Sequence, residues 1–345
     1  IIAAAANNGI GGVGIAYNCQ IMALKAAQYS GVLSSVDIAE AINYAVAQGA
    51  DIINMSFGGP ATSTLVEDAL AVAFNQAVLV ASAGNSGRPT EFPPAIPAPM
   101  PNFPASYIYV LGTMAQLQAP NAKGEWLADF SNWDSIPNSR IEYELMAPGV
   151  AIPSTLPGAQ YAAWSGTSMA APVVSGIAAL VRTKFPDKDL YSSRFIMGQL
   201  ASVGPQLLGN RAGISYYSTD ALQAVASTPE PELTFLDYWI FDGPNIAAVN
   251  NANGIINAGE TIDLAVVIKN RWGKADPVTV KISAQAPGGA VGPSPYITWI
   301  NDTVDYGAVG NFGEDDNGLI YENGLITGVR FPFKFTVSPD CPNDF

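Results

Sequence analysis

A polar turn near the middle of the chain leads directly into a long run of small and apolar residues. The turn is Gly-Thr-Ser at residues 166–168, and the run after it carries no charged side chain through Val181. Apolar residues such as Val174, Ala178 and Val181 recur there at helical spacing, which predicts a buried helix. Ser168 would then lie at the helix N-terminus, where free backbone N–H groups favour developing negative charge. A nucleophilic hydroxyl beside such donors suits acyl transfer; the alternative is that these hydroxyls only cap the helix.

The segments before this helix alternate between strand and helix patterns. Short apolar runs at residues 21–25, 51–56 and 77–83 are typical of buried parallel strands. Residues 35–48 and 64–76 carry helical periodicity between them. Strand–helix–strand order with short connections predicts a parallel sheet with right-handed crossovers. In such a sheet the functional groups collect beyond the carboxyl ends of the strands.

Two strand-ending loops and the central turn together carry a family resemblance. The loops read NMSFGGP at residues 54–60 and ASAGNSG at residues 81–87, and the turn reads GTSMAAP at residues 166–172. In this order they resemble the motifs of the subtilisin-like (subtilase, peptidase S8) serine proteases, over about residues 1–226. The resemblance implies an α/β fold, a subtilisin-like parallel sheet with helices on both faces. Many family members have a non-catalytic histidine where this chain has Val173.

The resemblance implies roles for individual residues. Ser168 would attack a peptide carbonyl, and the Asn85 side chain with the Ser168 N–H would hold the oxyanion. An exposed edge segment would pair with the substrate backbone as an added strand, opposite a second wall of the S1 pocket. The edge segment comprises Ser56, Phe57 and Gly58, and the wall comprises Ala81, Ser82, Ala83 and Gly84. The implied activity is that of a serine endopeptidase with protein or peptide substrates and a broad, apolar P1 preference.

A glycine-rich loop is the candidate cation site. Residues 1–6 are predicted to end a buried helix, and four glycines follow within residues 7–16. In many subtilases a loop of this kind wraps a structural calcium ion. The implied ligands are the Asn8 side chain and the carbonyls of Ala6, Ile10 and Gly12, with further ligands from upstream. A simple glycine-rich turn is the alternative, and no cofactor is expected for catalysis.

Neither the catalytic histidine nor the catalytic aspartate is assigned within these residues. The 345 residues include no histidine, and they begin at Ile1 within an Ala-rich pattern. By resemblance, the histidine would lie just upstream of Ile1 and the aspartate further upstream. We therefore expect an N-terminally truncated fragment with negligible proteolytic activity on its own. A pseudoprotease that binds peptides without cleaving them and a surface adhesion protein are the alternatives.

Composition restricts the partners and the location. A net charge of −14 argues against nucleic acid and anionic membranes as partners. No apolar run reaches membrane-spanning length without breakers. The acidic, Lys-poor composition suits a secreted or cell-surface protein, which we expect to be a monomer. Cys19 and Cys341 are expected to be free thiols, although a disulfide between them stays open.

A change of composition marks a second domain. The subtilase-like catalytic domain is assigned to residues 1–226, and a polar, Pro-containing linker to residues 227–233. Strand patterns then dominate residues 234–345, which predicts a small all-β sandwich. Residues 250–260 resemble the opening of immunoglobulin-like modules in bacterial secreted proteins. The Pro-rich residues 88–104 are interpreted as a stiff exposed loop without an assigned role.

Overall fold

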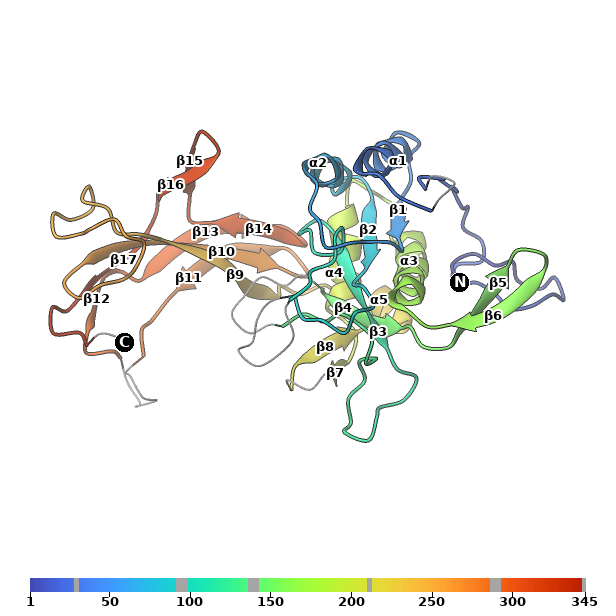
Figure 1. Cartoon of the computed structure of the whole chain (residues 1–345). Helices are drawn as coiled ribbons and strands as arrows, with labels where there is room; N and C mark the ends of the chain where they lie inside the picture. The colour runs from blue at the N-terminus through green and yellow to red at the C-terminus, as the bar shows by residue number, and fades with distance from the viewer. Residues whose placement is uncertain (28–30, 91–98, 136–142, 210–212, 286–292, 343–345) are drawn as a thin grey trace. The chain divides into compact units, whose positions relative to one another are not determined.

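The chain folds into two compact units. A computed structural model describes residues 1–27, 31–90, 99–135, 143–209, 213–285 and 293–342. The units are Ile1–Pro229 and Glu230–Phe345 (Figure 1). Their division falls within the segment predicted as a linker. Among the described residues, no helix has both the length and the apolar character that crossing a membrane requires.

The first unit is built on a six-stranded sheet with the order β1-β2-β3-β4-β8-β7. All neighbouring strands run parallel except β7 and β8, which are antiparallel. Its strands are β1 (Ile52–Met55), β2 (Val78–Ser82), β3 (Leu111–Gln116), β4 (Leu145–Pro148), β7 (Gln206–Leu208) and β8 (Ser215–Ser218), and a separate hairpin contains β5 (Ile152–Leu156) and β6 (Gln160–Trp164). Its helices are α1 (Ser35–Ala47), α2 (Thr64–Ala73), α3 (Thr167–Lys184), α4 (Ser193–Ala201) and α5 (Ala221–Ala226). The α/β fold with a largely parallel sheet that the sequence predicts is confirmed.

Helix α3 is the central helix of this unit. It packs across β1, β2, β3 and β4, as Figure 1 shows for the green helix beside the sheet. The predicted apolar face is confirmed, because Ala170, Val174, Ala178 and Val181 are all fully buried. A buried valine contributes roughly 1.5–3 kcal/mol relative to an exposed one. Packing therefore fixes α3, and with it the polar turn at its N-terminus.

Two predictions for the first 25 residues are wrong. Residues 1–5 are not helical, because the N–H groups of Gly14, Ile15 and Ala16 take the carbonyls of Ala4, Ile1 and Ile2 at 2.8–3.1 Å. A segment this short cannot repay the cost of helix nucleation once its carbonyls bind elsewhere. Residues 21–25 form no strand, and the Ile21 side chain is 61% exposed. Among the described residues no strand lies beside them to supply ladder hydrogen bonds, which a parallel strand needs on its flanks.

The second unit is all-β. A five-stranded sheet has the order β12-β17-β10-β14, with β9 also paired to β10. Strand β10 runs antiparallel to each of its partners β14, β17 and β9. The other pairs are β11 with β13 and β15 with β16. The strands are β9 (Leu233–Phe241), β10 (Thr261–Asn270), β11 (Ala275–Lys281), β12 (Ile297–Asn301), β13 (Thr303–Val309), β14 (Gly313–Asp316), β15 (Leu319–Glu322), β16 (Leu325–Val329) and β17 (Phe333–Val337).

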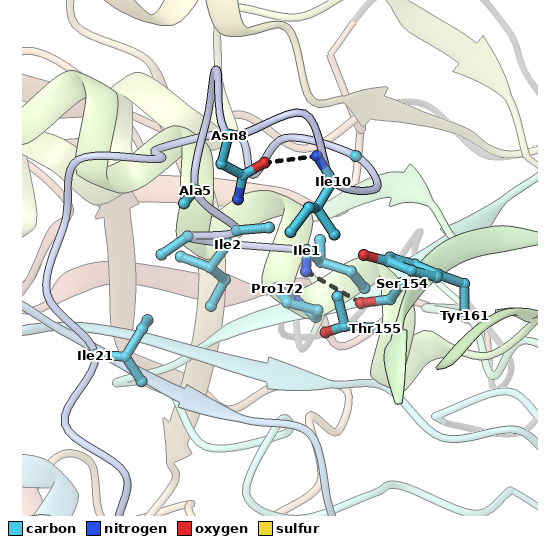
Figure 2. Close-up of a pocket in the computed structure, with 13 residues that line it drawn as sticks. Ile1, Ile2, Ala5, Asn8, Ile10, Ile21, Ser154, Thr155, Tyr161 and Pro172 are labelled. Carbon is cyan, nitrogen blue, oxygen red and sulfur yellow. Dashed lines mark hydrogen bonds between the residues drawn. The ribbon is translucent and has the colours of Figure 1, made fainter. Parts of the chain in front are cut away.

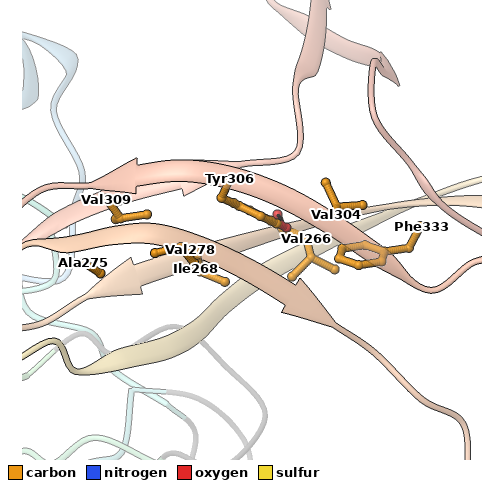
Figure 3. Close-up of a cluster of buried hydrophobic side chains, with 8 residues drawn as sticks. All are labelled: Val266, Ile268, Ala275, Val278, Val304, Tyr306, Val309 and Phe333. Atoms are coloured by element: carbon orange, nitrogen blue, oxygen red, sulfur yellow. Dashed lines mark hydrogen bonds between the residues drawn. The ribbon is translucent and has the colours of Figure 1, made fainter.

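The core of this unit lies between two sheets. Val266 and Ile268 from β10 pack with Val278 from β11 and Val304 from β13 (Figure 3). Phe333 from β17 closes the same cluster and is fully buried. Side chains from the five-stranded sheet and from the β11–β13 pair therefore share one core, as in a sandwich. The all-β character predicted from the strand patterns is confirmed.

Candidate active site

Strand register brings the two predicted loops together. β1 and β2 run parallel with Met55 opposite Ala81, so the chain leaves both strands at the same edge of the sheet. The loop after β1 begins at Ser56, and the loop after β2 leads to Asn85. The N-terminus of α3 meets both loops, because Ser168 contacts Ser56 and Thr167 contacts Asn85. The sheet edge where parallel strands end thus gathers all three sequence motifs.

Ser168 and Ser56 exchange hydrogen bonds in both directions. The Ser56 hydroxyl donates to the Ser168 carbonyl at 3.0 Å, and the Ser168 hydroxyl donates to the Ser56 carbonyl at 3.3 Å. Ser168 is the second residue of α3, and its side chain is only half-buried. The nucleophile candidate is therefore accessible and held on rigid backbone at the same time.

A polar chain extends this arrangement into the body of α3. The Asn54 amide nitrogen donates to the Ser56 hydroxyl at 2.9 Å, and the Ser175 hydroxyl lies 3.0 Å from the Asn54 amide oxygen. The end of β1 is thus linked to α3 both at Ser168 and at Ser175, two helical turns further along. These contacts fix the height of the α3 N-terminus above the end of β1.

Thr167 orients the Asn85 amide. Both the N–H and the hydroxyl of Thr167 donate to the Asn85 amide oxygen at 2.9 Å, and the Gly84 N–H donates to the Thr167 hydroxyl at 3.1 Å. With its oxygen engaged twice, the Asn85 amide directs its nitrogen toward Gly166. A Cβ built on Gly166 would lie 3.6 Å from that nitrogen and 3.7 Å from the Ser168 backbone nitrogen. Two N–H donors therefore border the open side of Gly166, together with the Met169 sulfur at 3.5 Å from the same Cβ position.

Within the part of the chain that the structure describes, no acceptor takes the Ser168 N–H. As the second N–H of a helix it has no intrahelical acceptor, and the next two N–H groups, of Met169 and Ala170, donate to the Gly166 carbonyl at 3.0 and 3.3 Å. The α3 dipole adds partial positive charge at the same point. The arrangement can therefore stabilise the negatively charged oxygen of a tetrahedral adduct in which the Ser168 side-chain oxygen is bound to the former carbonyl carbon.

Asn132 holds the loop at residues 84–88, which contains Asn85, through backbone hydrogen bonds. It is buried, and its amide oxygen accepts from the N–H groups of Ser86 and Arg88 at 3.0 and 3.1 Å. Its own N–H donates to the Gly84 carbonyl at 2.9 Å. The sequence motifs gave Asn132 and Thr167 no role. No local sequence pattern indicated them, because their roles depend on contacts with the Asn85 loop.

The residues predicted to bind substrate lie at the two loops. Ser56 and Phe57 are half-buried and Gly58 is exposed, whereas the Ala81, Ser82 and Ala83 side chains are buried in and beyond β2, and Gly84 is half-buried. The Gly59 N–H and carbonyl pair with the carbonyl and N–H of Phe103 at 3.0 and 2.8 Å. The loop after β1 is therefore braced by the segment at Phe103.

Comparison with known proteins identifies this arrangement. Residues 1–202 match the profile Peptidase_S8, the subtilase family. The chain belongs to the subtilase family. The matched residues include both loops and the α3 N-terminus, and this subtilase chain has no histidine.

Relatives of the subtilase match about half of its residues. It is 40% identical over 185 residues to a thermophilic serine proteinase of Bacillus sp. (strain AK1), spanning 53% of this chain and 41% of that protein. It is 36% identical over 184 residues to subtilisin E of Bacillus subtilis (strain 168), spanning 53% of this chain and 44% of that protein. The chain therefore spans about half the length of the curated relatives it matches.

Solved structures confirm the subtilisin-like fold. The structure titled S41 Psychrophilic Protease superposes with a TM-score of 0.55 at 28% identity, covering 63% of this chain and 73% of that one. Sphericase superposes with a TM-score of 0.54 at 27% identity, covering 62% of this chain and 71% of that one.

The glycine-rich loop of the subtilase lies apart from Ser168. Asn8, Ile10 and Gly12 line a cavity of about 500 Å³ that also contacts Ser154 and Tyr161 of the β5–β6 hairpin (Figure 2). The Asn8 amide oxygen accepts from the Ile10 N–H at 3.0 Å. The predicted donors are all neutral, and among the described residues no cluster of three acidic, Cys or His side chains could hold a metal. Four neutral oxygens fall short of the six to eight that calcium takes, so these residues alone do not complete a calcium shell.

Proposed function

We propose that the chain supplies the nucleophile and the oxyanion donors of a secreted serine endopeptidase of broad specificity. The Ser168 hydroxyl adds to the substrate carbonyl and passes its proton to a general base. The Asn85 amide nitrogen and the Ser168 N–H stabilise the oxyanion that forms. Expulsion of the amine leaves an acyl group on Ser168, and water releases it.

One observation carries this proposal: the space beside Gly166. The Asn85 amide nitrogen and the Ser168 backbone nitrogen both border it, at 3.6 and 3.7 Å from a Cβ built on Gly166. Thr167 presets the amide, so its orientation needs no reorganisation when charge develops. Preorganised donors of this kind supply the largest part of catalysis in many enzymes. Helix capping alone would not require Asn85 to be aligned in this way.

We propose further that the base and its partner come from outside these 345 residues, because the chain contains no histidine. In subtilisin, the case from which the rule was drawn, losing either the serine or the histidine costs nearly as much as losing the whole triad. The 345-residue chain by itself is therefore expected to have negligible activity on casein.

The test compares two polypeptides, the 345-residue chain and the longest polypeptide encoded in frame with it, each with and without Ser168→Ala. The longer polypeptide should cleave casein and take up a fluorophosphonate label, and Ser168→Ala should abolish both. Asn85→Ala should lower kcat roughly 10²–10³-fold, the size of the loss when subtilisin itself loses its oxyanion asparagine. Lys123→Ala, an exposed site outside the three motifs, is the control that should change nothing.

Three results would overturn parts of this proposal. Cleavage that survives Ser168→Ala would remove Ser168 from the mechanism. Cleavage by the 345-residue chain alone would refute the need for outside residues. If the longer polypeptide bound peptides without cleaving them, the protein would be a pseudoprotease, for which the absence of histidine is the favouring observation.

Secretion and a monomeric state are also proposed. The net charge of −14 and the shortage of lysine support a soluble, self-repelling surface. Fractionation of the producing cells should recover the protein outside the cytoplasm, and light scattering should give the mass of one chain. Recovery in the cytoplasm, or the mass of a dimer, would contradict the respective proposal.

A structural calcium ion is proposed at the glycine-rich loop, with Ala6, Asn8, Ile10 and Gly12 as part of its shell. The missing ligands would be water or residues outside the chain. Calcium at 5 mM, about 100-fold above a Kd of roughly 50 µM, would then raise stability by about 2.7 kcal/mol. The midpoint of thermal unfolding should rise with calcium and not with magnesium, and Asn8→Ala should remove the rise. An equal response of the variant would exclude this loop.

A further inference from the structure

Pro172 interrupts the hydrogen-bond ladder of α3 one turn after Ser168. It lies inside the helix, and proline has no backbone N–H. In an α-helix the Ser168 carbonyl would accept from the N–H four residues further on, so Pro172 leaves this carbonyl without its helical donor. The Ser56 hydroxyl donates to the same carbonyl at 3.0 Å. A side chain from the loop after β1 therefore supplies the hydrogen bond that Pro172 cannot make.

The Ser168 carbonyl also sets the direction of the hydrogen bonds that lead to it, because a carbonyl can only accept. The Ser56 hydroxyl has a single proton. Since that proton goes to Ser168, Ser56 must act as the acceptor in its contact with Asn54. The Asn54 amide nitrogen is the donor, at 2.9 Å from the Ser56 hydroxyl oxygen. The amide oxygen of Asn54 is then directed away from Ser56, and it lies 3.0 Å from the Ser175 hydroxyl.

Ser175 holds the far end of this chain of hydrogen bonds. It is buried in α3, two helical turns beyond Ser168. Its hydroxyl has two acceptors within reach, the Asn54 amide oxygen at 3.0 Å and the Ala171 carbonyl at 3.1 Å. A serine hydroxyl inside a helix needs only the carbonyl four residues back, so the contact with Asn54 is additional. Among the described residues no other group donates to the Asn54 amide oxygen.

We propose that Ser175 is a positioning residue of the active site. Its hydroxyl orients the Asn54 amide, and the oriented amide directs the Ser56 hydroxyl to the Ser168 carbonyl. Without this donor the amide would turn its oxygen to Ser56 and take the Ser56 proton, and the Ser168 carbonyl would lose its hydrogen bond. The inference rests on the proposed function, in which Ser168 carries both the nucleophile and an oxyanion donor. A shift of the Ser168 backbone therefore displaces two groups that act on the same carbonyl carbon.

The kinetic test uses the longest polypeptide encoded in frame with the chain and a chromogenic peptide anilide. Ser175→Ala should lower kcat about tenfold, the factor that corresponds to one lost hydrogen bond. KM should stay nearly constant, because Ser175 touches no part of the substrate. Ser175→Thr keeps the hydroxyl and should keep most of the activity. Thr183→Ala is the matched control and should leave kcat unchanged, because the Thr183 hydroxyl also lies on α3 and donates to the carbonyl of Ala179, four residues back, at 2.8 Å.

A double variant separates an effect transmitted through Ser56 from a general loosening of α3. In Ser56→Ala the hydroxyl that the Asn54 amide directs is already absent. Adding Ser175→Ala to this variant should therefore cause no further loss of kcat. Losses that multiply in the double variant would show that the two residues act independently, and they would overturn the inference. An unchanged kcat in Ser175→Ala alone would overturn it as well.

Amide hydrogen exchange on the 345-residue chain tests the same contacts without cleavage. The N–H groups of Met169 and Ala170 bond the Gly166 carbonyl at the start of α3. They should exchange about fivefold faster in Ser175→Ala and no faster in the double variant than in Ser56→Ala. Unchanged exchange in Ser175→Ala would overturn the inference.

Two further arrangements keep the result decisive. If Ser175→Ala does not fold, Ser175→Cys replaces it, since the thiol has a similar shape and is a weaker donor; its losses should have the same sign, and unchanged kcat and exchange would overturn the inference. If the longer parent polypeptide does not cleave the anilide but the predicted exchange is found, the proposed function is refuted. The assignment of Ser175 as the residue that positions Ser168 would then still stand.

Discussion

The hydroxyl of Thr167 can be removed to test how the oxyanion donors are held. Thr167 is fully buried, and its hydroxyl donates to the Asn85 amide oxygen and accepts from the Gly84 N–H. Thr167→Ala removes two hydrogen bonds, worth about 1 kcal/mol each, and a methyl group, worth about 0.8 kcal/mol. A small gain in helix propensity offsets part of this loss. We expect a net destabilisation of about 2–3 kcal/mol, from the same principles.

Thr167→Ser is the matched control, since it keeps the hydroxyl and loses only the methyl group. Its expected cost is about 0.8 kcal/mol. The assay is urea unfolding of the full chain, followed through the transition of the Ile1–Pro229 unit. Equal losses in the alanine and serine variants would show that the hydroxyl does not hold Asn85 and Gly84, and the argument for preorganised donors would fail.

Three further changes have defined outcomes. Gly176→Ala should destabilise the first unit by about 1–3 kcal/mol, because the new Cβ would lie 2.8 Å from the Ile15 Cβ. In urea unfolding, the double variant with Ile15→Ala should recover part of this loss. Strictly additive losses from the two substitutions would contradict the clash. Asn317→Ala should destabilise the second unit by about 3 kcal/mol, because the buried amide accepts from the Val266 N–H and donates to two carbonyls. An unchanged midpoint of urea unfolding for the second unit would refute this prediction. Burial raises the pKa of Asp315, so its contribution is greatest at acid pH and is lost as pH rises through the raised pKa. Asp315→Asn should therefore stabilise the second unit at pH 7. The difference in unfolding free energy between the variant and the parent chain should shrink as the pH falls, and a difference that grows on acidification would contradict the prediction.

Periodicity and motif order were enough to predict the fold of the first unit. The apolar positions of α3 and the run at β2 are buried where the sequence places them, because parallel strands and central helices bury nearly every residue. In β1 only Met55 is buried, and the three residues before it are half-buried. The same reasoning failed for residues 21–25, since an apolar run specifies a strand only when another strand lies beside it. The sequence pattern of these residues contains no information on that neighbour.

The candidate site was only partly predictable. Ser168 and Asn85 were found because each lies in a motif with a recognisable order. Thr167 acts through its contact with Asn85, which lies 82 positions away in sequence. Such pairings depend on the register of β1 against β2 and on the path of the loops, which no local pattern reports. The Pro-rich residues 88–104 have no assigned role, and residues 91–98 of this stretch are outside the described residues.

The link from Ser168 through Ser56 and Asn54 to Ser175 has a consequence for protein engineering. Helix α3 cannot be transplanted alone with its function, because the position of its N-terminus is fixed by side chains of β1 and of the loop after it. Transplanting residues 166–184 into another scaffold would carry Ser168 without the hydrogen bonds from Ser56 and Asn54 that fix its position. A graft would need residues 54–56 as well, and a mutant library that varies Ser175 would alter nucleophile placement from two helical turns away.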